Sequence, residues 1–305
     1  MEMKDVMAID IMNHPGEATH DLEEAGSQME FKEYQIMAKT TFKTVFGGVI
    51  PSKEMWEQAS ALSGHQNVEA MIADMDELGY DKILIVATKF WSYRYHLDYL
   101  ANFKIETVGK IVDQAKGRVI GGAGYDPTHI MESLADVERG VKEFGFKYVW
   151  THPLSWGLSP RDKKWYPLYA KCQELGIAVG MQVGQSAEVL PSWHGQPMEV
   201  DEIAIDFPDL RINMSHTGWP WTAEFCSMIW RHPNVYGDTS AYFPKGLDPV
   251  LIRFIDGARG RDKVMFGTNG LGLRRCKEEM LQLGMKDRSL QMILRDNAIK
   301  YLELE

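Results

Sequence analysis

Apolar residues in this sequence fall into short runs that alternate with longer amphipathic segments. Eight of the runs have the length and composition of buried strands, and we predict strands at 6–12, 82–87, 118–125, 147–152, 177–183, 211–216, 234–240 and 263–269. Between them, apolar residues recur at helical spacing. The predicted helices cover 67–79, 129–145, 166–176, 222–233 and 248–260.

Strands that alternate with helices over this length predict a parallel (β/α)8 barrel, the TIM barrel, as a single domain over residues 1–305. The competing fold is a doubly wound open sheet. Such a sheet more often carries a glycine-rich phosphate-binding turn after its first strand, and the segment NHPGEATH at 13–20 is not one. We therefore favour the barrel.

Residues 13–66 do not fit the repeat, because they are too many for a connection between a strand and its helix. They contain a helical segment of their own, EFKEYQIMAKTTFK at 30–43. Long insertions after the first strand of a barrel lie over the C-terminal ends of the strands, where active sites are built. We expect this insert to serve as a lid or as a dimer contact, and we leave both open.

Charge and composition disfavour several classes of partner. A formal net charge of -10 opposes binding to nucleic acid or to anionic membranes, which need a basic surface. No apolar run approaches the roughly 18 residues of a membrane helix, and the opening MEMKDVM lacks the apolar centre of a signal peptide. The 3 cysteines are far apart and odd in number, so we expect free thiols and a cytoplasmic location.

Polar side chains gather at the predicted C-terminal ends of the strands, the face that holds barrel active sites. They are Asp10, Met12 and His14 on the first strand, which alternation places on one side, His152 on the fourth, Gln182 on the fifth, His216 on the sixth and Asn269 on the eighth. Each histidine alone could be a hydrogen-bonded residue at the solvent edge. Three that converge on one mouth indicate function.

Aromatic residues follow the same strands, among them Trp91, Tyr125 and Trp219. Packing explains most tryptophans, but several on one face of a barrel indicate a flat, apolar or aromatic small-molecule substrate. Arg94 and Lys89, just after the second strand, could hold an acidic group of that substrate. A role as solvated loop residues is an equal alternative.

Four segments carry a family resemblance: DFPDLRINMSHTGWPW at 206–221, HPNVYGDTSAYFP at 232–244, DKVMFGTN at 262–269 and DNAIKYLEL at 296–304. They resemble the second amidohydrolase-related family, which includes aminocarboxymuconate semialdehyde decarboxylase, γ-resorcylate decarboxylase and metal-independent lactonases. The resemblance extends over most of residues 7–304 and weakens within 17–65. It implies a barrel and, as in many relatives, a homodimer.

The resemblance also implies where a metal would bind. The family's usual site has His-x-His or Glu-x-His on strand 1, a His on strand 5 and an Asp on strand 8, with a strand-6 His as acid/base. The matching residues here are Met12 and His14, Gln182, Asn269 and His216. Three of these four ligand positions do not suit a divalent transition metal, so we expect no metal and no other cofactor. A site rebuilt from Asp10, His14 and His152 stays open as an alternative.

These observations favour a metal-independent enzyme that hydrolyses or hydrates a small cyclic or conjugated carbonyl compound. His216 would transfer the proton, while His14 and His152 would polarise the carbonyl. The predicted substrate-binding residues are Asp10, Met12, Gln182, Asn269, Trp91, Tyr125, Trp219 and Arg94. The alternatives are a non-oxidative decarboxylase or other carbon–carbon lyase acting on an aromatic acid, and a catalytically inactive barrel that binds a small molecule.

Overall fold

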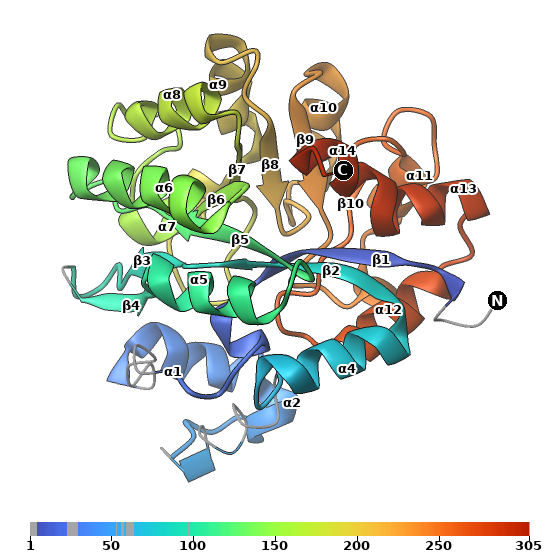
Figure 1. The fold of residues 1–305 in the computed structure, drawn as a ribbon, viewed down its shortest axis with the longest axis horizontal. Helices are drawn as coiled ribbons and strands as arrows, with labels where there is room; N and C mark the ends of the chain where they lie inside the picture. Colours follow the sequence, from blue (N-terminus) through green and yellow to red (C-terminus); the bar gives the residue numbers. More distant parts are fainter. Residues whose placement is uncertain are drawn as a thin grey trace.

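The computed structural model describes residues 5–22, 30–52, 54–55, 58, 64–96 and 98–304. Eight parallel strands form one sheet that curls into a barrel (Figure 1). In sheet order they are β1 (Ala8–Asn13), β2 (Tyr80–Val86), β5 (Val119–Gly124), β6 (Tyr148–Thr151), β7 (Ala178–Gln182), β8 (Ile212–Ser215), β9 (Val235–Asp238) and β10 (Val264–Met265). All eight predicted strands and the predicted barrel are confirmed.

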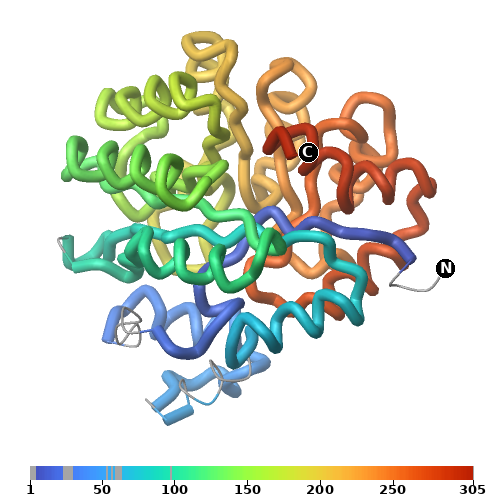
Figure 2. The backbone as a smooth tube through the Cα atoms, viewed as in Figure 1, coloured from blue at the N-terminus to red at the C-terminus, as the bar shows by residue number. Residues whose placement is uncertain are grey.

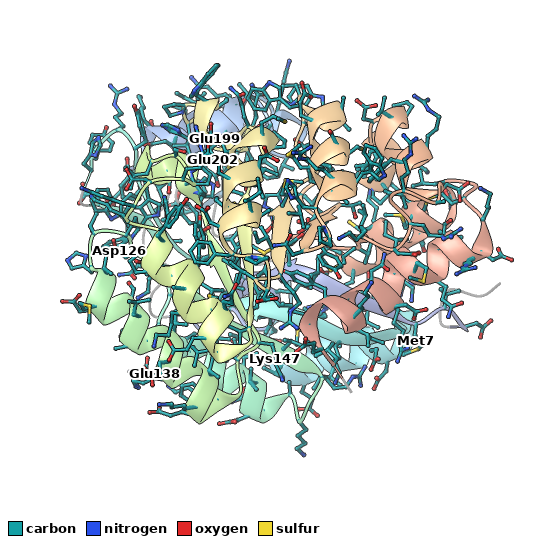
Figure 3. The ribbon with its side chains drawn as sticks, turned by 90° about the horizontal axis from the view of Figure 1, so that it is seen from above. Met7, Asp126, Glu138, Lys147, Glu199 and Glu202 are labelled. Carbon is teal, nitrogen blue, oxygen red and sulfur yellow. The ribbon has the colours of Figure 1, made fainter. Side chains whose placement is uncertain are left out.

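The first and last strands meet where the chain has circled the barrel (Figure 2). The Ile11 amide donates to the carbonyl of Phe266 at 3.0 Å, and the Asn269 amide donates to the carbonyl of Met12 at 2.9 Å. Parallel strands place all their C-terminal ends on one side of the sheet. Accordingly, Met7, which precedes β1, and Asp126, which follows β5, lie on opposite sides of the molecule (Figure 3).

Helices connect the strands and surround the sheet (Figure 1). They are α4 (Val68–Leu78), α5 (Ile105–Gln114), α6 (Ile130–Phe144), α8 (Tyr166–Leu175), α9 (Val200–Asp206), α10 (Thr222–Arg231), α11 (Pro249–Ile255), α12 (Leu273–Leu281), α13 (Asp287–Gln291), a π-helix (Met292–Asp296) and α14 (Asn297–Leu302). Among the described residues, no helix is long and apolar enough to span a membrane.

Local sequence sets the ends of these helices. Asn67 caps α4, because its side-chain oxygen accepts from the Ala70 amide at 2.9 Å. α6 ends at Gly145, whose φ of 68° lies in the left-handed region that glycine adopts without strain. Inside the barrel, a Cβ at Gly180 would lie 1.6 Å from the Tyr148 hydroxyl, so only glycine fits there. The predicted helix at 129–145 is confirmed.

The insert contributes a short 3-10 helix (Pro15–Glu17), α1 (Lys32–Lys39) and α2 (Lys43–Phe46). In Figure 1, α1 and α2 lie at the lower edge of the molecule, below α5 and α4. The predicted helical segment at 30–43 is confirmed as α1, and parts of the insert between 23 and 63 lie outside the described residues. Glu33 of α1 accepts hydrogen bonds from the Ser92 hydroxyl at 2.7 Å and the Arg94 amide at 3.1 Å. A use as lid or dimer contact remains a prediction.

Those two bonds join the insert to a feature that the sequence did not predict. The antiparallel hairpin of β3 (Lys89–Trp91) and β4 (Tyr99–Asn102) follows β2, outside the barrel sheet. Its strands are too short to leave a recognisable alternation. The hairpin brings Phe90 and Trp91 toward the C-terminal ends of the barrel strands.

His65 holds the end of the insert against its beginning. Its Nδ1 donates to the Glu17 carbonyl at 2.9 Å and lies 3.2 Å from the Glu17 carboxylate, while Nε2 lies 3.3 Å from the carboxylate of Asp74. The hydrogen bond to the Glu17 carboxylate is the main reason that the pKa of His65 rises from 6.5 to about 9, and burial opposes the rise. The protonated imidazole therefore stabilises the folded chain.

We expect this stabilisation to be complete below pH 6.5 and to disappear as the pH rises through about 9, because the folded pKa exceeds the unfolded one. Replacing His65 by Asn should lower the free energy of unfolding at pH 6 by up to about 1 kcal/mol. Urea unfolding of both proteins at pH 6 and pH 9.5 measures this. A difference that is equal at the two pH values would contradict the prediction.

Candidate active site

A cavity of about 450 Å³ opens at the C-terminal ends of the strands, a volume suited to a small molecule. Six of the predicted site residues line it: His14, His152, Gln182, His216, Trp219 and Asn269. They follow or end five different strands, so the barrel brings together side chains that are far apart in sequence.

Trp150, near the end of β6, contacts all three histidines of the cavity. Its ring centroid lies 6.1 Å from that of His14, 5.5 Å from that of His152 and 6.0 Å from that of His216. The indole nitrogen donates to the Ser215 hydroxyl at 3.2 Å, which fixes the ring. Phe90 of the hairpin stacks on His152 at 5.0 Å with an interplanar angle of 22°. The cavity therefore has flat aromatic walls.

His216 follows β8 and is tied to β9 through two residues. The Asp238 carboxylate accepts from the His216 amide at 3.1 Å and from the Ser240 hydroxyl at 2.5 Å. The same hydroxyl oxygen lies 2.6 Å from Nδ1 of His216. Because the Ser240 proton points to Asp238, the hydroxyl oxygen accepts from Nδ1–H. This arrangement leaves the unprotonated nitrogen of the neutral ring at Nε2.

Asp238 is buried, and its charge is compensated by hydrogen bonds. Besides His216 and Ser240, it accepts from the Asn213 amide group at 2.6 Å and from the Ser240 backbone amide at 3.0 Å. Buried carboxylates are tolerated when their oxygens accept several hydrogen bonds. Asp238 acts on the imidazole of His216 through Ser240 and does not itself line the cavity.

His152 uses both ring nitrogens in the scaffold. Nδ1 accepts from the Ser155 amide at 3.2 Å and so caps α7 (Pro153–Trp156), while Nε2 donates to the Ser186 hydroxyl at 3.3 Å. His14 has one scaffold contact of this kind, between Nδ1 and the Thr88 hydroxyl at 3.1 Å. His14 is thus freer than His152 to bond a substrate.

The three imidazoles are neutral at neutral pH. Burial, followed by the proximity of His216, lowers the pKa of His14 to about 4, and the Asn269 side chain opposes this shift. Burial and His216 lower the pKa of His152 to about 3. Burial also lowers the pKa of His216 below 6.5, with the charge of Asp238 opposing it. At pH 7 these rings can therefore serve as bases or neutral hydrogen-bond donors.

Backbone strain gathers around this cavity. Among the described residues, seven other than glycine have positive φ, and four of these line the cavity: His216 (73°), Thr217 (64°), Ala241 (64°) and Asn269 (53°). A left-handed conformation costs a β-branched residue such as Thr217 about 1–3 kcal/mol. Such strain persists where surrounding contacts fix a geometry that a site requires.

Two residues of β1 lie outside the cavity, which corrects our prediction that they bind substrate. The Asp10 carboxylate accepts from the Thr268 amide at 3.0 Å, the Thr268 hydroxyl at 2.6 Å and the Met12 amide at 3.2 Å. Met12 is fully buried. The pairing of β1 with β2 shifts register between Asp10 and Asn13, so the simple alternation that we assumed does not hold.

Three further predicted residues also lie away from the cavity and are corrected. Trp91 packs on Trp156 with ring centroids 4.4 Å apart. The Tyr125 hydroxyl donates to the Lys164 carbonyl at 2.9 Å. Arg94 is exposed, with its guanidinium 6.0 Å from the Tyr95 ring, and does not line the cavity.

Sequence reasoning missed several residues of the site. Ser240 stands two positions after Asp238, so strand alternation could have placed it beside His216. Phe90 comes from the unpredicted hairpin, Thr41 from the insert, and Tyr242 and Glu188 from loops. Those four positions depend on long-range packing, and no local pattern marks them.

The side chains of this cavity do not fit a divalent metal. Both nitrogens of His152 and one nitrogen each of His14 and His216 are already hydrogen-bonded, and Gln182 and Asn269 are neutral amides. Within the described ranges, no group of three or more His, Cys, Asp or Glu side chains could hold a metal ion. The rebuilt site from Asp10, His14 and His152 is disfavoured as well, because Asp10 is committed to Thr268.

A family model described as amidohydrolase matches residues 65–304. The chain belongs to the amidohydrolase 2 family. The predicted family is therefore confirmed, and the match excludes most of the insert. No curated protein matches the chain.

Solved structures with this fold include an uncharacterized protein, a decarboxylase and a probable hydrolase. An uncharacterized TIM-barrel protein from Bordetella bronchiseptica is 23% identical, with 98% of this chain and 99% of that chain covered and a TM-score of 0.74. The 5-carboxyvanillate decarboxylase of Novosphingobium aromaticivorans, solved with manganese and 4-hydroxy-3-methoxy-5-nitrobenzoic acid, is 17% identical, with 99% and 97% covered and a TM-score of 0.67.

A probable 2-pyrone-4,6-dicarboxylic acid hydrolase from Acinetobacter baumannii, with citric acid bound, is 13% identical, with 97% and 99% covered and a TM-score of 0.57. Identities this low show the shared fold alone. The reaction depends on the side chains of the cavity and does not follow from the fold.

We expect the purified protein to contain well under one equivalent of zinc or manganese by elemental analysis, because its cavity offers too few free ligands. Dialysis against a chelator should leave its melting temperature unchanged. One bound equivalent whose removal lowers the melting temperature would contradict this prediction.

Proposed function

We propose that this protein hydrolyses or hydrates a small cyclic or conjugated carbonyl compound without a metal, and that His216 is its general acid/base. The observation that carries the proposal is the Asp238–Ser240–His216 chain of hydrogen bonds. It favours the neutral ring with its lone pair on Nε2. A neutral imidazole with a pKa below 6.5 can accept a proton at neutral pH.

Hydrolysis of a lactone illustrates the proposed roles. Nε2 of His216 takes a proton from water as the water oxygen bonds to the carbonyl carbon. The carbon–oxygen bond of the ring then breaks, and His216 returns the proton to the departing oxygen. The product is a hydroxy acid. In hydration of a conjugated ketone, the water oxygen bonds to the β-carbon of the double bond instead, and His216 returns the proton to the α-carbon.

The oxyanion formed in this reaction needs hydrogen-bond donors that are already in place. His14, Asn269 and Gln182 line the cavity and are the candidates for this role. Asn269 in particular is held by strained backbone beside His14, and its side-chain amide nitrogen is the group that can donate. We assign His152 to orienting Ser186 and the start of α7, since both its nitrogens are engaged.

The second candidate is decarboxylation of an aromatic acid, the activity named for several proteins of similar fold. The aromatic walls formed by Phe90, Trp150 and Tyr242 suit a flat ring and favour this alternative. It is weaker because the cavity offers neither a set of metal ligands nor, among the described residues, a cationic side chain that could hold the carboxylate.

Replacing His216 by Asn should lower turnover at least about 100-fold, because general acid–base catalysis commonly contributes that much. The measurement is kcat on a panel of lactones and conjugated ketones. His129→Asn is the matched control, since the His129 side chain is 59% exposed and lies outside the cavity. Near-normal turnover of the His216 variant would refute the assignment.

Ser240 should act as a positioning residue. Ser240→Ala removes the acceptor of the His216 Nδ1–H. We expect kcat to fall about tenfold, which is less than the loss expected when the base itself is removed. In the wild type, kcat/KM should fall on acidification with a midpoint below pH 6.5, because His216 must be neutral. In the variant that midpoint should move lower, since the protonated ring loses a partner.

Ser289→Ala is the control for this variant, because Ser289 is equally buried but lies on α13, outside the cavity. A purely structural role for Ser240 would lower stability and leave the pH midpoint in place. That outcome would contradict the assignment.

A further inference from the structure

The charged residues of the cavity all have the same sign. Two carboxylates line it, Glu188 and Asp248, and among the described residues no lysine or arginine does. The 5-carboxyvanillate decarboxylase and the probable 2-pyrone-4,6-dicarboxylic acid hydrolase of similar fold are named for substrates that carry carboxylates. A pocket that binds a carboxylate needs a compensating charge or several donors.

Two cationic side chains that follow β2 are turned to other partners. The ammonium of Lys89 lies 3.1 Å from the Asp136 carboxylate on α6. Arg94 is exposed beside Tyr95. Both follow β2, where a residue that grips an acidic substrate could stand, and neither reaches the cavity.

Glu188 is built into the cavity wall. It accepts a short hydrogen bond from the Ser186 hydroxyl, and that oxygen in turn accepts from Nε2 of His152 at 3.3 Å. On the other side, Glu188 contacts Tyr34 of the insert and, after burial itself, is the main group raising the pKa of that phenol. This series of hydrogen bonds holds the negatively charged Glu188 carboxylate in the wall of the cavity, where a substrate would bind.

Asp248 contributes a second fixed charge. Its carboxylate accepts from the Val250 amide at 2.7 Å and caps α11. The imidazoles do not offset these charges, since burial holds His14 and His152 neutral at pH 7.

We propose that this cavity selects an uncharged substrate, such as a lactone or conjugated ketone without a carboxylate on the ring, and repels aromatic acids through Glu188 and Asp248. An aromatic carboxylate entering the cavity would lose its water and meet two like charges and neutral rings. The inference rests on the proposed function for the identity of the reacting carbonyl. The selection against charged molecules concerns binding to the cavity and does not depend on which reaction follows.

Binding of a matched pair of probes tests the proposal without any turnover. Benzamide and benzoate have nearly the same shape and differ in charge at pH 7.5. Isothermal titration calorimetry of His216→Asn with each should give a dissociation constant at least about tenfold lower for benzamide. Benzoate binding as tightly as benzamide, or failure of both to bind at millimolar concentration, would overturn the proposal.

Glu188→Gln, which keeps the size of the side chain, should tighten benzoate binding at least threefold and leave benzamide binding unchanged. Glu132→Gln is the control, because it removes the same charge from the exposed face of α6. An equal effect of the two substitutions would overturn the role of Glu188.

Ionic strength gives a second measurement on the unmodified protein. Raising salt from 0.05 to 0.5 M screens repulsion, so it should tighten benzoate binding and leave benzamide unaffected. Weaker benzoate binding in salt would reveal an attractive charge and refute the proposal. The proposed function can fail independently of this proposal. In that case His216→Asn would retain turnover while the preference for benzamide persists.

Discussion

The hydrogen bonds of the buried Asp10 carboxylate join the first strand of the barrel to the last. The amide and hydroxyl of Thr268 both donate to this carboxylate, and Asn13 accepts from the Gly270 amide at 2.9 Å. Between these anchors stands Asn269, in the left-handed conformation. Burial raises the pKa of Asp10 to about 7, and these bonds oppose the rise. The hydrogen bonds of Asp10 and Asn13 thus close the barrel and fix Asn269 beside His14.

A second constraint is electrical neutrality deep in the cavity. Without a cation, a carboxylate at position 269 or a protonated imidazole at position 14 would be a buried charge with no partner. Amides at 182 and 269 and neutral rings at 14, 152 and 216 avoid that cost together. The buried carboxylate of Asp238 remains, and four donated hydrogen bonds compensate its charge.

The sequence predicted the strands and six cavity residues because both follow from local pattern: buried parallel strands are apolar, and functional side chains follow their C-terminal ends. It failed where the pattern is broken or non-local. In β1 the pairing with β2 shifts register after Asp10, and the Asp10 carboxylate bonds Thr268 instead of lining the cavity. The hairpin at 89–102 places Trp91 against Trp156. Glu188 belongs to a loop whose position depends on the insert.

Shared fold therefore decides little about the reaction. A protein with a TM-score of 0.67 to this chain was solved with manganese, whereas Met12, Gln182 and Asn269 leave this cavity without a set of metal ligands. In the proposed reaction, hydrogen-bond donors fixed in advance have to stabilise the developing oxyanion in place of a cation. The strained turns at 216–217 and 269 are where the backbone bears the energetic cost of fixing these donors. Such a site stabilises charge that appears during the reaction better than charge that the substrate brings. That asymmetry is the physical basis of our proposal that the barrel takes a neutral carbonyl compound rather than an aromatic acid.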